Sequence, residues 1–115
     1  MHVNDNLRFG NGTDNYHKYI VGMVLSDGAK AMADKYGLFW YMDAICSYQI
    51  HKKFQDQPFQ VWTLERKQHE FTAIVKATDG NDNVLVTQHI EFTDFEGTLA
   101  TIWIEGNVLL LPSEH

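Results

Sequence analysis

The spacing of apolar residues changes from a helical period to a strand period about halfway along the chain. In residues 38–53, apolar side chains recur every three or four positions, as at Leu38, Met42 and Ile45, which is the period of one face of an α-helix. From Phe59 onward, apolar and polar residues alternate, which is the period of a strand with one buried face. The pattern therefore predicts helices in the first half and a sheet in the second.

Two helices are predicted, at residues 26–36 and 38–53. The first opens at Ser26-Asp27-Gly28, where the polar side chains can accept hydrogen bonds from free N–H groups. It ends at Gly37, because glycine is the residue typical of helix C-termini. The second is apolar on nearly all sides, so we expect it to be the most buried helix. It ends before Pro58, because proline lacks a backbone N–H.

Five strands are predicted, at residues 59–67, 70–78, 84–93, 99–105 and 108–111. The apolar faces of the second and third include Phe71 and Phe92, so both rings are expected in the core. Residues 16–25 are expected to be a short strand or an extended segment, and residues 1–15 a flexible N-terminal arm. We therefore predict one α+β domain, residues 1–115, in which two helices pack on a four- to five-stranded antiparallel β-meander.

The C-terminal residues are unusually apolar for a chain end. Val108 to Leu111 is a run of four large aliphatic residues followed by Pro112, whereas chain termini usually fray. We expect this run to be buried against the chain's own core or against a partner. The strand edges of an open meander also favour self-association, and a two-fold homodimer is the expected form.

The formal net charge of −6 narrows the classes of partner. It repels nucleic-acid phosphates and anionic lipids, so direct nucleic-acid or membrane binding is not expected. The same charge suits docking on a basic protein surface. Three Trp, five Tyr and seven Phe supply candidate anchors for such an interface.

Cysteine usage and the first residues indicate a cytoplasmic protein. Cys46 is the single cysteine, so no internal disulfide can form, which fits a reducing compartment. We expect its thiol to be buried and inert. Met1 to Asn6 lacks the basic and apolar regions of a signal peptide, and no apolar stretch approaches the roughly 20 residues that span a membrane.

Asp43 is the most unusual residue of the second predicted helix. It is surrounded by Tyr41, Met42, Ala44 and Ile45, and a buried carboxylate is unfavourable unless it is paired or hydrogen-bonded. One interpretation is a ligand-binding or general-base carboxylate with a raised pKa. The other, which we favour, is a structural group that accepts hydrogen bonds from backbone, tyrosine or indole donors.

The other candidate binding residues fall into two groups. A ligand pocket between helices and sheet would combine Asp43 with Tyr48, Gln49, Trp62 and Trp103. Glu91 alternates with His89 on one face of its strand, and we expect it to face solvent or a concave surface. At the polar strand ends, Asp94 is expected to cap a turn and Glu114 to reach a basic residue of the chain, and both could instead form the rim of a binding surface. No residue is assigned a catalytic role, and the predicted ligand- or partner-binding set is Asp43, Tyr48, Gln49, Trp62, Trp103, Glu91 and Asp94.

The sequence carries no recognisable catalytic, cofactor or metal motif. It has no phosphate-binding loop, no dinucleotide fingerprint and no nucleophile elbow. Its six histidines are not spaced as zinc ligands are. Residues Asp79 to Asn83 are predicted to form a hairpin turn, because the glycine and the final glutamate that a calcium-binding loop requires are missing. We therefore expect no cofactor and no metal, and favour a non-enzyme over an enzyme.

Several blocks in one order resemble a known family. The residues Phe39-Trp40-Tyr41-Met42-Asp43-Ala44-Ile45-Cys46-Ser47-Tyr48-Gln49 are similar to a helix of the DUF6876 family of small uncharacterised bacterial and phage proteins. Further similar blocks are residues 13–16, 26–30, 59–62, 91–95 and 109–114. The resemblance implies no activity or catalytic residue. It implies an origin in phages or other mobile elements, and hence interference with host machinery or defence.

Two functions follow as hypotheses. The first is a non-catalytic binding protein that inhibits a host or defence protein, as anti-CRISPR proteins do, by occluding a basic surface. The second is a protein that binds or sequesters a small ligand, such as a nucleotide or metabolite. A hydrolase that uses Asp43 or His89 is a third and less favoured interpretation.

Overall fold

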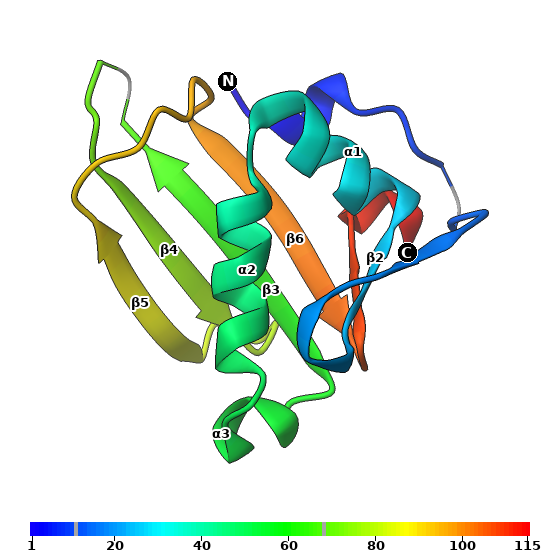
Figure 1. The fold of residues 1–115 in the computed structure, drawn as a ribbon. Coiled ribbons are helices and arrows are strands. Elements are labelled where there is room, and N and C mark those ends of the chain that lie inside the picture. The colour runs from blue at the N-terminus through cyan, green and yellow to red at the C-terminus, as the bar shows by residue number, and fades with distance from the viewer. Residues whose placement is uncertain (11, 68) are drawn as a thin grey trace.

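The computed structural model describes residues 1–10, 12–67 and 69–115, and it shows one mixed seven-stranded sheet with its helices on one face (Figure 1). The predicted fold of two helices on a four- to five-stranded antiparallel meander is therefore wrong in detail. The strands are β1 (Tyr16–Lys18), β2 (Val24–Ser26), β3 (Phe59–Arg66), β4 (Ala73–Thr78), β5 (Val84–Ile90), β6 (Leu99–Glu105) and β7 (Val108–Leu110).

The sheet is mixed because residues 16–26 form two strands that join it, where one short strand or an extended segment is predicted at residues 16–25. Its order is β1-β2-β7-β6-β3-β4-β5, and β2 pairs with β7 in parallel while every other pairing in it is antiparallel. β1 and β2 have three residues each, too few for an alternating pattern to emerge. The backbone turns between them through Val21, whose φ is +49°. The C-terminal aliphatic run thus inserts between β2 and β6 as an interior strand, and Leu109 and Leu111 are buried.

The predicted alternation holds along β3, β4 and β6. Trp62 and Leu64 of β3 and Ile102 and Ile104 of β6 are buried on the helix-facing side, and their neighbours on each strand are more exposed. Trp62 pairs with Ile102 in the register. This central strand pair forms the floor of the core.

Two long helices and one short helix cover this floor (Figure 1). They are α1 (Asp27–Tyr36), α2 (Phe39–Tyr48) and α3 (Lys52–Gln55). Ser26 caps α1 by accepting a hydrogen bond from the N–H of Ala29, and Gly37 ends it with a left-handed φ of +65°, as predicted.

The single predicted helix at residues 38–53 is two helices in the structure. Leu38, Met42 and Ile45 are fully buried, which confirms the predicted stripe. The chain leaves the helix after Tyr48 and exposes Ile50. This turn starts α3 in a new direction, so that Phe54 enters the core at 4% exposure.

The N-terminal residues, expected to be a flexible arm, lie against β6. Val3 is fully buried, and a short 3-10 helix spans Val3–Asn6. The carbonyl of Met1 accepts hydrogen bonds from the N–H groups of Thr98 and Leu99. Asn4 donates to the carbonyl of Thr101 and accepts from its N–H, at 2.9 and 2.8 Å. Asn11, also within the expected arm, lies outside the described residues.

Candidate functional site

Two phenylalanine rings stand exposed at one end of the sheet. Phe71 is 67% and Phe92 72% exposed, and the rings stack with centroids 6.0 Å apart and planes inclined by 21°. Phe71 comes from the β3–β4 connection and Phe92 from the β5–β6 connection. Because large aromatic side chains usually bury most of their area, a stacked exposed pair marks a candidate contact surface.

The prediction that both rings lie in the core is wrong. β4 begins at Ala73 and β5 ends at Ile90, so Phe71 and Phe92 lie beyond the paired part of the strands. Alternation places a side chain on the buried face only while the ladder continues. Beyond it, the backbone turns and the two rings contact each other.

Arg66 holds the two connections together. Its guanidinium donates to four backbone carbonyls, those of Lys67, Glu70, Glu96 and Gly97, at 2.7 to 3.2 Å. The N–H of Thr93 also donates to the carbonyl of Phe71 at 2.7 Å. These hydrogen bonds hold in place the two connections that carry Phe71 and Phe92. The Arg66 guanidinium is hydrogen-bonded to backbone carbonyls of the same chain.

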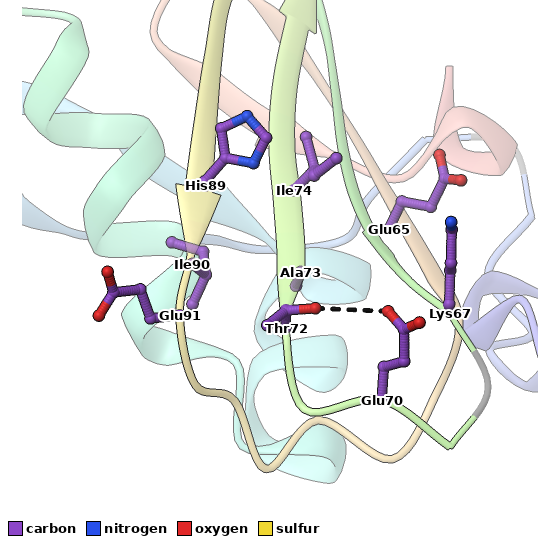
Figure 2. Close-up of a pocket in the computed structure, with 9 residues that line it drawn as sticks. All are labelled: Glu65, Lys67, Glu70, Thr72, Ala73, Ile74, His89, Ile90 and Glu91. Atoms are coloured by element: carbon purple, nitrogen blue, oxygen red, sulfur yellow. Dashed lines mark hydrogen bonds between the residues drawn. The ribbon is translucent and has the colours of Figure 1, made fainter.

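Exposed carboxylates surround the aromatic pair. We call the surface formed by these residues the tip: Phe71 and Phe92 with Glu70, Glu91, Asp94 and Glu96. One side of the tip is a hollow of about 600 Å³ lined by both rings, by Glu70, Asp94 and Glu96, and also by Arg66 and His69. Figure 2 shows the adjoining hollow of about 360 Å³, where Glu70 and Glu91 lie on either side of Thr72.

The tip contains two of the residues predicted from sequence. The sequence predicts that Glu91 faces solvent or a concave surface and that Asp94 caps a turn or forms the rim of a binding surface, and both residues are exposed at the tip. Sequence reasoning missed Phe71, Phe92, Glu70 and Glu96. The acidic and aromatic residues of the two strand connections could have indicated this surface. The alternating pattern instead predicted that these residues belong to strands.

Tyr48, Gln49 and Trp62 belong to a hydrogen-bonded network inside the domain. Gln60, which is 1% exposed, accepts hydrogen bonds from Trp62 Nε1 and Gln49 Nε2, both at 2.9 Å. Tyr48 packs on the Trp62 ring and donates its hydroxyl hydrogen to Gln88 at 2.9 Å. These contacts join α2 to the sheet and occupy the polar groups that a ligand would need.

Asp43 is exposed and not buried, contrary to expectation. Its carboxylate accepts a hydrogen bond from the hydroxyl of Tyr19. Partial burial raises the pKa of Tyr19 well above its usual value, and the bond to Asp43 adds to the effect. The carboxylate thus ties the segment before β2 to α2.

Trp103 lies on the opposite face of the sheet from the helices. It is half-buried and packs edge-on against Phe59 and His115, with centroids 5.2 and 5.4 Å away. The five residues expected to line one ligand pocket are therefore distributed over a core network, a helix surface and the far sheet face. They do not converge on a common cavity.

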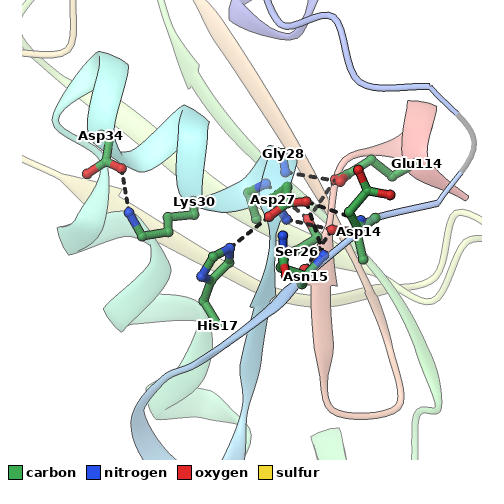
Figure 3. Close-up of polar contacts among 11 residues, drawn as sticks. Asp14, Asn15, His17, Ser26, Asp27, Gly28, Lys30, Asp34 and Glu114 are labelled. Carbon is green, nitrogen blue, oxygen red and sulfur yellow. Dashed lines mark hydrogen bonds and ion pairs between the residues drawn. The ribbon is translucent and has the colours of Figure 1, made fainter.

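A second polar cluster lies at the start of α1 (Figure 3). Glu114, which is 2% exposed, accepts hydrogen bonds from Ser26 Oγ at 2.6 Å and from the N–H of Gly28 at 3.0 Å. Asp27 accepts from His17 Nε2 at 2.8 Å. The bond from His17 is the main reason why the pKa of Asp27 lies below its usual value. Carboxylates are favourable at this end of a helix, so the cluster holds the C-terminal segment and residues 13–17 against α1.

The described part of the chain contains neither a metal-binding cluster nor a membrane-crossing helix. Across residues 1–10, 12–67 and 69–115, no three His, Cys, Asp or Glu side chains gather in a way that would hold a metal ion. Within the same ranges, no helix has the length and apolar character to cross a bilayer.

The comparison with protein families places the whole chain in one group. The model of DUF6876, a family of unknown function, matches residues 1–115. The chain belongs to the DUF6876 family. Neither curated proteins nor solved structures gave a significant match. Membership of DUF6876, a family of unknown function, assigns no activity to the chain.

Proposed function

We propose that this DUF6876 protein is a non-catalytic binding protein that docks its tip on a basic surface of a partner protein. The observation that carries the proposal is the exposed Phe71–Phe92 pair with carboxylates around it. Aromatic side chains are frequent energetic anchors of interfaces. Surrounding acids favour a partner of opposite charge and speed its encounter.

The internal bonds of the tip support a docking role. Arg66 braces both connections through their carbonyls, so binding would not need to order them. A preorganised surface loses less conformational entropy on association than a loose loop does. Each anchor ring can therefore contribute most of its contact energy to the complex.

Occlusion of a basic groove is the mechanism that we favour. The chain has a net charge of −6, and a basic groove that binds nucleic acid would attract the tip by the same electrostatics. The partner in this proposal is a host or defence protein, inhibited because its nucleic-acid surface is covered. An anti-CRISPR protein acts in this general way.

The test is a quantitative pull-down with matched variants. The bait would be the wild type, Phe71→Ala/Phe92→Ala, and Ile50→Ala, whose parent side chain is 60% exposed but lies away from the tip. We expect one partner that binds the wild type and Ile50→Ala, is lost with the double variant, and dissociates as salt rises. The purified partner should then lose nucleic acid in competition with the wild type.

Two results would contradict the proposal. One is a partner that the double variant retains as well as the wild type does. The other is binding that does not weaken in high salt, because charge attraction between the tip and a basic surface must be screened.

A further inference from the structure

The two rings of the tip leave their outer faces open to solvent. Phe71 and Phe92 stack with centroids 6.0 Å apart and planes inclined by 21°, so each ring covers one face of the other. A planar group between them would need a separation of about 7 Å, because contacting carbon atoms lie about 3.5 Å apart. The two residues are 67% and 72% exposed. A ligand of the pair therefore contacts the outer ring faces and does not insert between the rings.

Three carboxylates beside the rings are available to an external cation. Glu70, Asp94 and Glu96 line the same hollow as the two rings. None of the ion pairs found within residues 1–10, 12–67 and 69–115 includes any of the three. Glu70 accepts a long hydrogen bond from the hydroxyl of Thr72, at 3.4 Å (Figure 2), which leaves most of its acceptor capacity open.

The cation that the chain itself supplies to this hollow is already engaged. Arg66 lines the hollow, but its guanidinium donates to four backbone carbonyls. Lys67 lines the adjoining hollow and not this one. With His69 neutral, three carboxylates and one guanidinium leave a formal charge of −2 on the lining. Both this charge and the open ring faces attract a cation.

We propose that the tip binds an arginine side chain of the partner protein in preference to a lysine, which rests on the docking function proposed above. A guanidinium is planar and weakly hydrated, so it can stack flat on a ring while two of its N–H groups bind one carboxylate. A lysine ammonium is a compact and strongly hydrated charge, so it loses more hydration against an apolar ring. Carboxylates attract both cations, and the exposed rings favour the guanidinium.

The hollow has the size and the order that this side chain requires. Its volume of about 600 Å³ falls within the range of small-ligand sites, about 300–1,000 Å³. The N–H of Thr93 donates to the carbonyl of Phe71 at 2.7 Å, and Arg66 joins the same two connections. The rings and carboxylates are therefore held in place before binding, and the main ordering cost falls on the arginine side chain.

Isothermal titration calorimetry with two peptides of equal charge would test the preference. The probes are tetra-arginine and tetra-lysine with capped ends, titrated at low salt. We expect the wild type to bind tetra-arginine about three- to tenfold more tightly, because a guanidinium gains more from an aromatic face. Phe71→Leu/Phe92→Leu keeps apolar side chains and the net charge but removes both aromatic faces. In this variant, the affinity for tetra-arginine should fall to that for tetra-lysine.

A matched pair of variants tests the carboxylates. Asp94→Asn removes one charge from the hollow, and Asp82→Asn makes the same change in the turn between β4 and β5, where the residue is also exposed. We expect Asp94→Asn to weaken the binding of both peptides by about two- to fivefold and Asp82→Asn to leave it close to the wild type. Equal losses in the two variants would mean that the overall charge, and not the tip, attracts the peptides, and would overturn the proposal.

Two further results would overturn the arginine preference. One is a wild type that binds the two peptides equally or does not bind tetra-arginine. The other is a preference for arginine that persists in Phe71→Leu/Phe92→Leu, because the rings would then have no part in it. The docking function is decided separately by the pull-down: a salt-sensitive partner lost with Phe71→Ala/Phe92→Ala supports it even if the two peptides bind equally.

Discussion

The carboxylate of Glu114, one residue from the C-terminus, accepts a hydrogen bond from the N–H of Gly28 in the first turn of α1. The distance is 3.0 Å, and the other carboxylate oxygen accepts from Ser26 and from the N–H of Leu111. A Cβ on residue 28 would overlap the Glu114 carboxylate and lie 2.8 Å from Leu111 Cδ1. The two ends of this contact, 86 residues apart, therefore constrain each other.

Replacing Glu114 should destabilise the fold. Glu114→Ala leaves buried donors at Gly28, Ser26 and Leu111 without their acceptor, and we expect a loss of about 2–4 kcal/mol in the free energy of unfolding. Urea denaturation followed by tryptophan fluorescence measures it. Glu91→Ala removes an exposed glutamate as a control. A change for Glu114→Ala within about 0.5 kcal/mol would show that the buried carboxylate is dispensable.

Gly28→Ala should be destabilising although alanine is the better helix former. In an open helix position the substitution would stabilise by roughly 0.5–1 kcal/mol, but here the methyl group overlaps Glu114. We expect a loss of about 1–3 kcal/mol. In a Glu114→Ala background the loss should shrink, which a double-mutant cycle detects. Additive effects of the two substitutions would contradict the contact.

Acid should weaken the attachment of residues 13–17 to α1. The hydrogen bond from His17, supported by backbone N–H donors at Asn15 and Asp14, holds the pKa of Asp27 below its usual value near 3.8. This contribution to stability is present above that value and is lost as pH falls through the folded-state pKa. Thermal unfolding of the wild type and Asp27→Asn should therefore differ at pH 5 and converge in acid. Asp14→Asn is the control, and parallel curves for wild type and Asp27→Asn would rule out the linkage.

Core and tip aromatics should differ sharply in their effect on stability. Trp62 is fully buried, and Trp62→Ala should lower the free energy of unfolding by about 3–5 kcal/mol. Phe71→Ala and Phe92→Ala remove exposed rings and should each cost about 1 kcal/mol or less. Chemical denaturation distinguishes these cases. A loss at Phe71 comparable to that at Trp62 would place Phe71 in the core after all.

Cys46 should be unreactive in the native protein. Burial, with a smaller contribution from the Asp43 carboxylate, raises the pKa of its thiol to about 12, and the residue is 0% exposed. Because the thiolate is the reactive form, alkylation at pH 8 should be slow until denaturant unfolds the chain. The rate can be followed by mass spectrometry against a cysteine peptide. A native rate equal to that of the peptide would refute the assignment.

Pattern reasoning located the long elements and the C-terminal strand, but it gave residues 16–25 as one short strand or extended segment where the structure has β1 and β2. Strand β6 lies at the predicted residues 99–105, and α1 starts and ends at its predicted cap residues. β1 and β2 are three residues long, so no period can be measured in them. The parallel pairing of β2 with the C-terminal run joins residues far apart in the sequence, and it turns the expected meander into a mixed sheet.

The sequence predicted only part of the candidate site, because the site also depends on contacts between distant segments. The sequence predicts Glu91 as a solvent-facing strand residue and Asp94 as a polar residue at a strand end, but Phe71 and Phe92 fit the alternation, which predicts them in the core. Where a strand stops pairing depends on the neighbouring strand and not on its own residues. Arg66 sets the geometry of the tip through carbonyls up to 31 residues away, and no local pattern contains that information.

The sequence by itself determined the character of this protein: an α+β chain of net charge −6 with a helix stripe at Leu38, Met42 and Ile45 and alternating strands from residue 59 onward. These properties depend on local periodicity and composition, which can be obtained directly from the sequence. Only the tertiary structure decided that the C-terminus lies inside the sheet, that Glu114 caps α1, and that Phe71 and Phe92 meet in solvent. Each of these depends on contacts between distant segments, whose geometry is set by the packing of the whole chain.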